Sequence, residues 1–296
     1  MDYNRSSYFG GGFIMFEVII WFFAIILIVP VEYIVENYFK TMMRGQGRSY
    51  ILQPIYRIIK LFEKKDGTIN YFACFFSIGA FVFSLIALYM TVAGFNFLFV
   101  VSVLSMMELF IIIGAYSANT FSGKICAQRA VSRFVVLLFT SMVAATTIYK
   151  TTGALNLGVL SGYSKSNGVF ISLVFTFISL FVILLIKGNI GYFNFGISGD
   201  ELSVLDAALF TPYSGWSLAL VQMTHWIEIG IWIKILSIFL PLNEWVSFLV
   251  IMILYLLFLL WDGFVAKVNW KQSAKYSWIW AGGVSLLNFI SLYVLR

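Results

Sequence analysis

Residues 71–90 read Tyr-Phe-Ala-Cys-Phe-Phe-Ser-Ile-Gly-Ala-Phe-Val-Phe-Ser-Leu-Ile-Ala-Leu-Tyr-Met, and no charged side chain interrupts them. A helix of about 20 mostly apolar residues crosses the hydrocarbon layer of a bilayer, where its backbone groups must be satisfied internally. The stretch therefore predicts a transmembrane helix. The whole chain agrees, because 61% hydrophobic residues, 11% charged residues and a mean hydropathy of +0.94 do not fit a soluble core with a polar shell.

Seven more windows share the length and apolar composition of this stretch. Together the eight windows predict an all-α, polytopic membrane protein that forms a single transmembrane domain over residues 1–296. Short breaks separate neighbouring spans, with Ala93-Gly94 between the second and third and Pro241 between the sixth and seventh. The eight predicted spans lie near residues 12–38, 69–92, 95–115, 131–150, 168–187, 216–240, 244–262 and 276–295.

The distribution of basic residues predicts the orientation of these helices. The net charge of +6 comes mainly from short connections rather than from an aromatic-interleaved basic module, so it does not indicate a nucleic-acid partner. The positive-inside rule places both termini outside and four connections inside. These inward-facing connections, at 39–68, 116–130, 188–215 and 263–275, are the expected partner surface.

The first inward connection predicts a short amphipathic helix that begins near Pro54. Pro54 suits the first turn of a helix, and the apolar positions 55, 58, 59 and 62 recur at helical spacing. Two functions remain open for this helix: a positively charged lip on anionic lipid, or a docking platform for a soluble partner.

The third inward connection gathers Asp200, Glu201 and Asp206 on a side where basic residues otherwise dominate. These carboxylates are candidates for contact with a basic partner or for a proton relay. The alternative is a solvated loop, or pairing with Arg48 or Arg129.

Ionisable residues inside membrane segments are costly, so each is a functional candidate. Glu108 lies deep in the third span, and His225, Glu228 and Lys234 lie in the sixth. A spacing of three places His225 beside Glu228, where the pair could share a proton. The alternatives are that these groups only satisfy one another, that Glu228 neutralises Lys234, or that they serve a stand-alone ion or solute transporter.

The sequence offers no pattern for metal binding or for soluble-enzyme chemistry. It contains one histidine and two cysteines, and we find no ligand-spaced cluster, no phosphate-cradling glycine loop and no nucleophile with an obvious base. We therefore expect no metal site, no catalytic residue and no disulfide framework in this chain.

Several short motifs occur in a fixed order along the inward connections and the spans that follow them. They are Gln46-Gly47-Arg48, Leu52-Gln53-Pro54, Ile59-Lys60-Leu61-Phe62, Gly114-Ala115-Tyr116-Ser117-Ala118-Asn119 with Arg129, Tyr213-Ser214-Gly215, and Gln272, Trp278 and Ser285-Leu286-Leu287-Asn288. Together they resemble the heel subunit of respiratory complex I, NADH:quinone oxidoreductase chain 1. The membrane subunit of energy-converting nickel-iron hydrogenases shares the first connection.

The resemblance implies a quinone tunnel roofed by the inward connections, with ubiquinone as substrate. The implied contacts with quinone or with the hydrophilic arm are Arg48, Gln53, Lys60, Ser117, Asn119, Arg129, Asp200, Glu201 and Tyr213. The candidates for a proton relay are Glu36, Glu108, His225, Glu228 and Lys234. The implied partners are the hydrophilic subunits of the quinone module and small membrane-arm subunits, with FMN and iron-sulfur clusters held by partner subunits. The richness in phenylalanine and the divergence from the family pattern favour the mitochondrial inner membrane over a bacterial or archaeal one.

Some positions depart from the family pattern. Leu202 and Val204 stand where the third connection of the family has carboxylates, and Leu138 stands where its fourth helix usually has a glutamate. The usual route for protons is therefore altered. Since a relay needs titratable groups within reach through water rather than at fixed positions, the available substitutes are Glu108, Glu201, His225 and Glu228.

Overall fold

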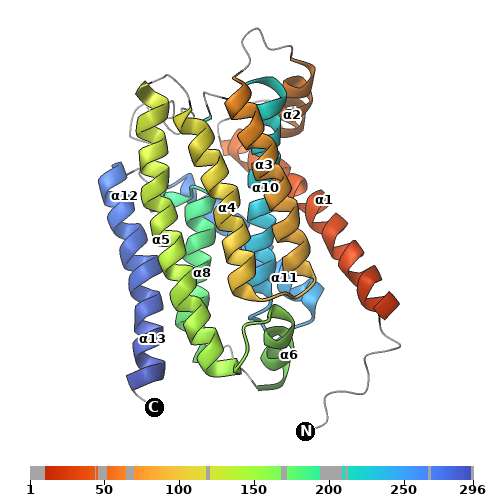
Figure 1. The fold of residues 1–296 in the computed structure, drawn as a ribbon, viewed down its shortest axis with the longest axis vertical. Helices are drawn as coiled ribbons and strands as arrows, with labels where there is room; N and C mark the ends of the chain where they lie inside the picture. The colour runs from red at the N-terminus through yellow and green to blue at the C-terminus, as the bar shows by residue number, and fades with distance from the viewer. Residues whose placement is uncertain are drawn as a thin grey trace.

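Long helices packed side by side make up the computed structural model of the chain (Figure 1). The structure describes residues 11–43, 45, 52–64, 70–117, 121–167, 172–193, 209–210, 213–265 and 268–294. The elements are α1 (Gly11–Met43), α2 (Gln53–Glu63), α3 (Tyr71–Val92), α4 (Phe97–Tyr116), α5 (Phe121–Thr152), α6 (Leu157–Asn167), α8 (Val174–Lys187), the 3-10 turn η2 (Gly191–Phe193), α10 (Gly215–Ser237), α11 (Glu244–Asp262), α12 (Trp270–Ser277), the π-helical segment η3 (Trp278–Gly283) and α13 (Val284–Val294).

The predicted all-α class is confirmed over the described residues. Five helices are long and apolar enough to cross a membrane: Ile19–Phe39 within α1, α3, α4, Gly123–Thr152 within α5, and α11. The other three predicted spans coincide with α8, with α10 and with the continuous rod of α12, η3 and α13. The predicted breaks at Gly94, which has a φ of 73°, and at Pro241 both separate helices.

Two helix boundaries and one additional helix differ from the prediction. Helix α5 begins at Phe121 and the last rod begins at Trp270, both well inside stretches that we expected to be connections, and α6 lies in a connection for which we predicted no helix. Hydropathy marks the length of chain that suits hydrocarbon, but it does not mark where a helix ends in water. The polar residues Lys124, Arg129 and Lys271 therefore masked these helical turns.

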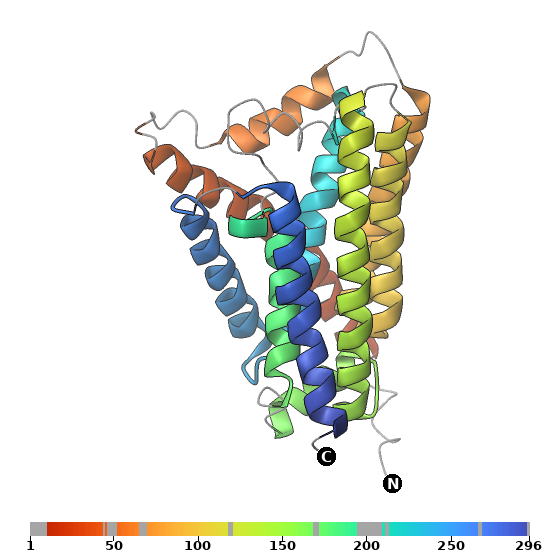
Figure 2. The same cartoon turned by 90° about the vertical axis from the view of Figure 1, so that its left-hand side faces the viewer.

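The bundle has two distinct ends (Figures 1 and 2). One end, called here the α2 end, holds α2, the last turn of α4 and the first turns of α5 and α10. The opposite end, called here the α6 end, holds α6, the start of α1 and the end of α13. The described parts of all four predicted inward connections lie toward the α2 end.

Helix α10 is the centre of the packing. It contacts α1, α2, α3, α8 and α11, and nearly all of its residues from Thr224 to Ser237 are buried. Gly230 allows α1 to approach closely, because a Cβ atom there would lie 2.5 Å from Ile25 Cγ2 and 2.8 Å from Val29 Cγ2.

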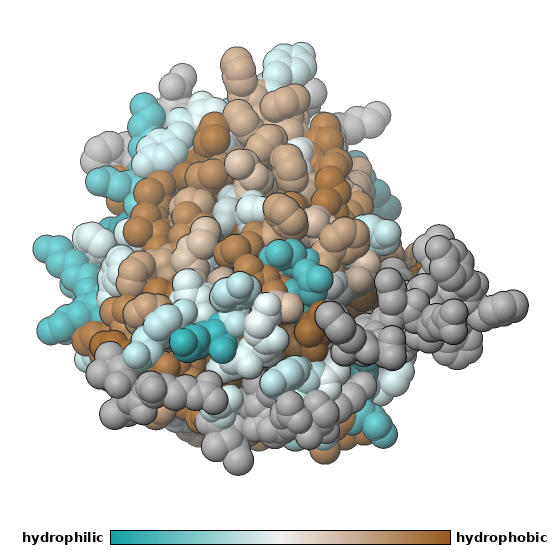
Figure 3. All heavy atoms as spheres, turned by 60° about the horizontal axis from the view of Figure 1, so that its bottom comes forward, coloured by the Kyte–Doolittle hydropathy of each residue, from teal (hydrophilic) through white to brown (hydrophobic). Residues whose placement is uncertain are grey.

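Much of the outer flank of the bundle is apolar. Phe23 and Leu27 on α1, Phe72 on α3 and Leu257 on α11 are all exposed, and the space-filling view shows broad hydrophobic areas between patches of hydrophilic residues (Figure 3). Such a surface suits lipid rather than water.

The close approach at Gly230 leads to a stability prediction. Replacing Gly230 by Leu forces the side chain into α1, and overpacking of this kind costs about 1–3 kcal/mol. We expect a lower thermal denaturation midpoint for the purified protein. Gly162→Leu is the matched control, since nothing lies within 4 Å of a Cβ atom there. Equal midpoints for the two variants would contradict the packing described.

Candidate functional site

A buried lysine lies between two carboxylates where α4, α8 and α10 meet. Lys187 Nζ lies 2.7 Å from Glu108 Oε2 and 2.6 Å from Glu228 Oε1. The three side chains are only 10%, 18% and 6% exposed. Charge-assisted contacts of this length, held away from water, are much stronger than surface ion pairs.

His225 completes this group on α10. Its Nδ1 lies 3.6 Å from Glu228 Oε2, so the predicted pairing at a spacing of three is present in the structure. The separation is longer than a normal hydrogen bond, and the contact becomes an ion pair when the imidazole is protonated. We refer to Glu108, Lys187, His225 and Glu228 as the charge cluster.

The end of α8 explains why Lys187 reaches the cluster. Lys187 lies in the last turn of α8, where the helix dipole favours a cation, and α8 stops at Gly188. Asn189 then adopts a positive φ of 53° and accepts a hydrogen bond of 2.7 Å from Arg133 Nη1. A second cation from α5 is thereby held near the carboxylates.

Two cavities border the charge cluster. One, of about 120 Å³, is lined by the cluster residues together with Arg133, Asn189 and apolar side chains such as Ile111 and Phe210. The other, of about 20 Å³, is lined by Glu108, Lys187, Glu228, Leu138, Ser141 and Trp232, among others. A water needs roughly 10–15 Å³ of such volume, so the first cavity has room for several waters and the second for one.

Two larger cavities lie between α1, α2 and α10, near the α2 end. A polar cavity of about 580 Å³ is lined by Tyr33, Asn37, Gln53, Pro54, Tyr56, Arg57, Lys60 and Gln222. An apolar cavity of about 230 Å³ is lined by Ile25, Ile26, Val29, Pro30, Ile55, Ile58, Ile59, Met223, Trp226 and Ile227. Both cavities are lined by residues of α1, α2 and α10, and α2 presents a different face to each, with Gln53, Tyr56, Arg57 and Lys60 toward the polar cavity and Ile55, Ile58 and Ile59 toward the apolar one.

The structure places most of the sequence-predicted residues in separate groups. Glu108, His225 and Glu228 come together, and Gln53 and Lys60 line the polar cavity. Arg129 lies elsewhere, on α5, with its guanidinium carbon 5.4 Å from the centre of the Trp270 ring. Arg48, Asn119, Asp200, Glu201 and the side chain of Glu36 lie outside the described residues.

The fourth and fifth motifs quoted above, at residues 114–119 and 213–215, contact each other. The Tyr213 hydroxyl donates a 2.8 Å hydrogen bond to the Ile111 carbonyl, and burial raises the pKa of this phenol. Gly114 gives Tyr213 the room that it needs, since a Cβ atom would collide with the phenol oxygen. Ser117 Oγ, in the same motif, donates to the Gly114 carbonyl at 2.6 Å. The motifs thus fix the connection before α10 against the end of α4.

The alternative that Glu228 neutralises Lys234 is wrong, and the sequence analysis did not identify Lys187 as a site residue. Glu228 pairs with Lys187, whereas Lys234 Nζ pairs with Glu244 Oε2 at 3.2 Å. Lys187 was not a candidate, because a lysine ending an apolar run normally extends to the membrane surface. The signal that could have identified it was that the third span offers Glu108 no cation and that Lys234, six residues after Glu228, lies on another face of the sixth span.

These features define a class of protein, a polytopic helical membrane subunit with buried charge in its interior. A family model described as NADH dehydrogenase matches residues 14–293. The chain belongs to the NADH dehydrogenase family, which confirms the resemblance inferred from the motifs.

A solved structure supports the same fold. A chain in the structure of the membrane-bound sulfane sulfur reductase, an archaeal respiratory membrane complex, superposes with a TM-score of 0.70 at 18% sequence identity. The match covers 93% of this chain and 99% of that chain. A search of curated proteins finds no match.

The charge cluster leads to a prediction about Lys187. Lys187→Met leaves two buried carboxylates facing each other, and loss of one partner from a buried ion pair costs about 3–5 kcal/mol. We expect a strongly lowered denaturation midpoint of the complex, recovered in part when Glu108→Gln and Glu228→Gln are added. A midpoint at the wild-type value for Lys187→Met alone would show that the cluster contributes nothing to stability.

Proposed function

We propose that this chain is the membrane heel subunit of a proton-pumping NADH:quinone oxidoreductase, complex I. In this role it binds quinone between α1, α2 and α10 and couples quinone reduction to proton movement through the charge cluster. The observation that carries the proposal is that α10 lines both sites. Gln222, Met223 and Trp226 line the two large cavities, whereas His225 and Glu228 belong to the charge cluster and line the cavity beside it.

The chemistry of the two cavities between α1, α2 and α10 suits a quinone. The apolar cavity can take an isoprenoid tail, and the polar cavity offers Gln53, Tyr56 and Arg57 to the carbonyl oxygens of a head group. The buried Nε1 of Trp226 has no hydrogen-bond partner among the described residues, so a further donor is available in the apolar cavity.

The charge cluster can transmit a change of charge. A proton on Glu228 weakens its attraction for Lys187, and the ammonium then moves toward Glu108, which lies on another helix. The imidazole of His225 lies beside Glu228 and can supply or accept the proton for it. The cavity of about 120 Å³ gives these groups room for a short chain of waters.

The remaining parts of the proposal concern the surroundings of the chain. We infer eight transmembrane helices with both termini on the outer side, so that the α2 end faces the mitochondrial matrix, or the cytoplasm if the membrane is bacterial or archaeal. Flavin and iron-sulfur clusters lie in partner subunits that dock at the α2 end. Helix α2, which has no buried residue in the isolated chain, is available as a platform for them.

A second candidate function is the membrane anchor of an energy-converting nickel-iron hydrogenase. The short first connection and the structural likeness to a chain of another type of respiratory complex favour it. A mass-spectrometric subunit list of the native complex separates the possibilities. Co-isolated NADH-oxidising flavin subunits support complex I, nickel-iron subunits support the hydrogenase, and a pure, transporting single chain contradicts both.

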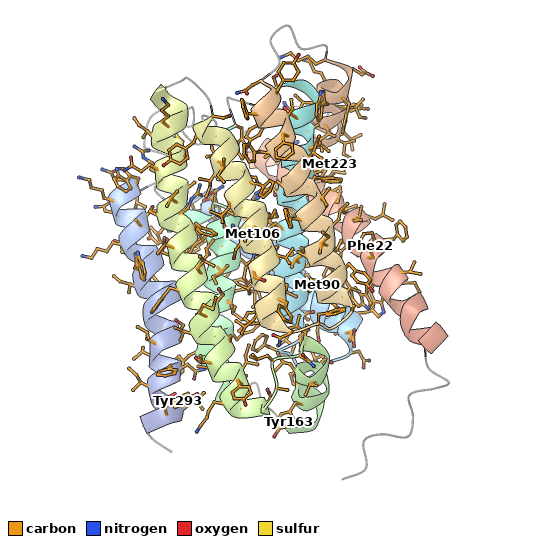
Figure 4. The ribbon with its side chains drawn as sticks, viewed as in Figure 1. Phe22, Met90, Met106, Tyr163, Met223 and Tyr293 are labelled. Atoms are coloured by element: carbon orange, nitrogen blue, oxygen red, sulfur yellow. The ribbon has the colours of Figure 1, made fainter. Side chains whose placement is uncertain are left out.

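Filling the apolar cavity tests the quinone site. Met223→Trp adds volume where we expect the quinone tail, so we predict a raised KM for quinone and at least a several-fold loss of quinone reductase activity in membranes. Met106→Trp is the matched control, because Met106 lies on the exposed side of α4 (Figure 4). Equal activity in the two variants would place quinone elsewhere.

Removing one charge from the cluster tests coupling. In Glu228→Gln the ammonium of Lys187 keeps its contact with Glu108 but loses its second carboxylate. We expect the number of protons translocated per electron, measured in sealed vesicles, to fall while NADH-driven quinone reduction continues. Unchanged proton translocation would contradict a relay role for Glu228.

A further inference from the structure

A separate cavity opens at the α6 end, away from the charge cluster. It has a volume of about 180 Å³ and is bordered by α1, α3, α6, α10 and α11. Its described lining includes two ionisable groups, Lys234 and Glu244, with the hydroxyls of Thr91, Ser161, Ser237 and Ser247 and the indole of Trp21.

Lys234 is held in this cavity by two kinds of contact. Its Nζ lies 3.2 Å from Glu244 Oε2 and 3.4 Å from the centre of the Trp21 ring, which stacks on Trp245 at 3.9 Å between centroids. A cation over an indole face is stabilised by the ring quadrupole. The lysine side chain is 6% exposed and the glutamate side chain 40% exposed, so the pair joins a buried cation to a carboxylate in contact with solvent.

Two further polar atoms indicate that water enters the cavity. Trp21 Nε1 and Ser247 Oγ are buried, line this cavity and have no hydrogen-bond partner among the described residues. Buried polar groups are normally satisfied, and leaving one unsatisfied costs free energy. A cavity of this size has room for several waters that satisfy both atoms.

A mostly apolar layer separates this cavity from the charge cluster. Between Glu228 and Lys234, α10 presents the buried Ile229, Ile231 and Ile233, and α1 closes against Gly230. Trp232 interrupts the layer, because it lines the small cavity beside the charge cluster and its buried Nε1 has no hydrogen-bond partner among the described residues. The two polar sites lie on opposite sides of this mostly apolar layer, one toward the α2 end and one toward the α6 end.

We propose that Lys234 and Glu244 form a proton-release station at the α6 end. The Lys234 ammonium gives one proton to the Glu244 carboxylate, which leaves a neutral amine and a neutral carboxylic acid. The acid then loses this proton to the water outside, and the amine takes up another proton arriving from the bundle interior. The pair thus ends each cycle with its original charges. This role rests on the proposed function, but the water-filled cavity itself does not.

The cavity is tested by thiol labelling in sealed vesicles of known orientation. In the native complex with Cys74 and Cys126 replaced by alanine, Ser247→Cys should react with a membrane-impermeant anionic thiosulfonate added on the α6 side. Ser84→Cys, equally buried but on α3 and outside this cavity, should remain unlabelled until the complex is denatured. A Ser247→Cys variant that reacts only after denaturation would overturn the aqueous cavity.

The release role is tested by the ratio of protons translocated to electrons transferred, which corrects for any lower electron-transfer rate. We expect this ratio to fall in Lys234→Met and in Glu244→Gln. Lys150→Met is the matched control, since Lys150 also lies over an aromatic ring, 4.9 Å from the centre of Tyr293, at the α6 end but is outside the cavity. The control ratio should equal that of the wild type.

The outcomes separate the two proposals. Labelled Ser247→Cys with wild-type ratios in Lys234→Met and Glu244→Gln would overturn the release station and leave quinone binding and the charge cluster in place. If Lys234→Met does not assemble, Glu244→Gln decides the matter, because the Glu244 side chain is 40% exposed at the rim and Lys234 keeps its contact with the Trp21 ring in this variant. Wild-type ratios in Glu228→Gln, in contrast, would overturn the coupling role of the charge cluster alone.

Discussion

The contact of Lys187 with Glu108 and Glu228 constrains the rest of the interior. Charged groups are costly to remove from water, and they remain charged only where opposite charges and hydrogen bonds replace the solvent. Three helices distant in the sequence must meet at this point to provide them. The end of α8, the turn at Asn189 and the position of Arg133 all follow from the need to hold cations beside two buried carboxylates.

Helix α10 links this contact to the cavities in which we propose that quinone binds. A helix turns about 100° per residue, so residues three and four apart share a face while adjacent residues point in different directions. Val221, His225 and Glu228 therefore face the cavity beside the charge cluster, and Met223, Trp226 and Ile227 face the apolar cavity next to α1 and α2. A small rotation or shift of one buried helix changes both sites together.

The structure gives a physical reason for one departure from the family pattern, the leucine at position 138. Leu138, at the position where the resemblance implies a glutamate on the fourth span, lines the same small cavity as Glu108, Lys187 and Glu228. We infer that Glu108, from the neighbouring helix α4, supplies a carboxylate to the space that residue 138 of α5 leaves apolar. The requirement is for negative charge near Lys187, and more than one helix can meet it.

The sequence by itself determined the helical membrane fold, most of the helix positions, the amphipathic helix α2 and the family. These depend on apolar length, on helical periodicity and on short ordered motifs, all of which are local properties of the chain. It also indicated Glu108, His225 and Glu228, because charge inside an apolar span is unusual wherever it occurs. Only the tertiary structure decided the pairing. The partner of Glu228 is Lys187 rather than Lys234, six residues further along the same helix, because long-range packing brings the end of α8 to the middle of α10 and turns Lys234 toward Trp21 and Glu244 at the opposite end.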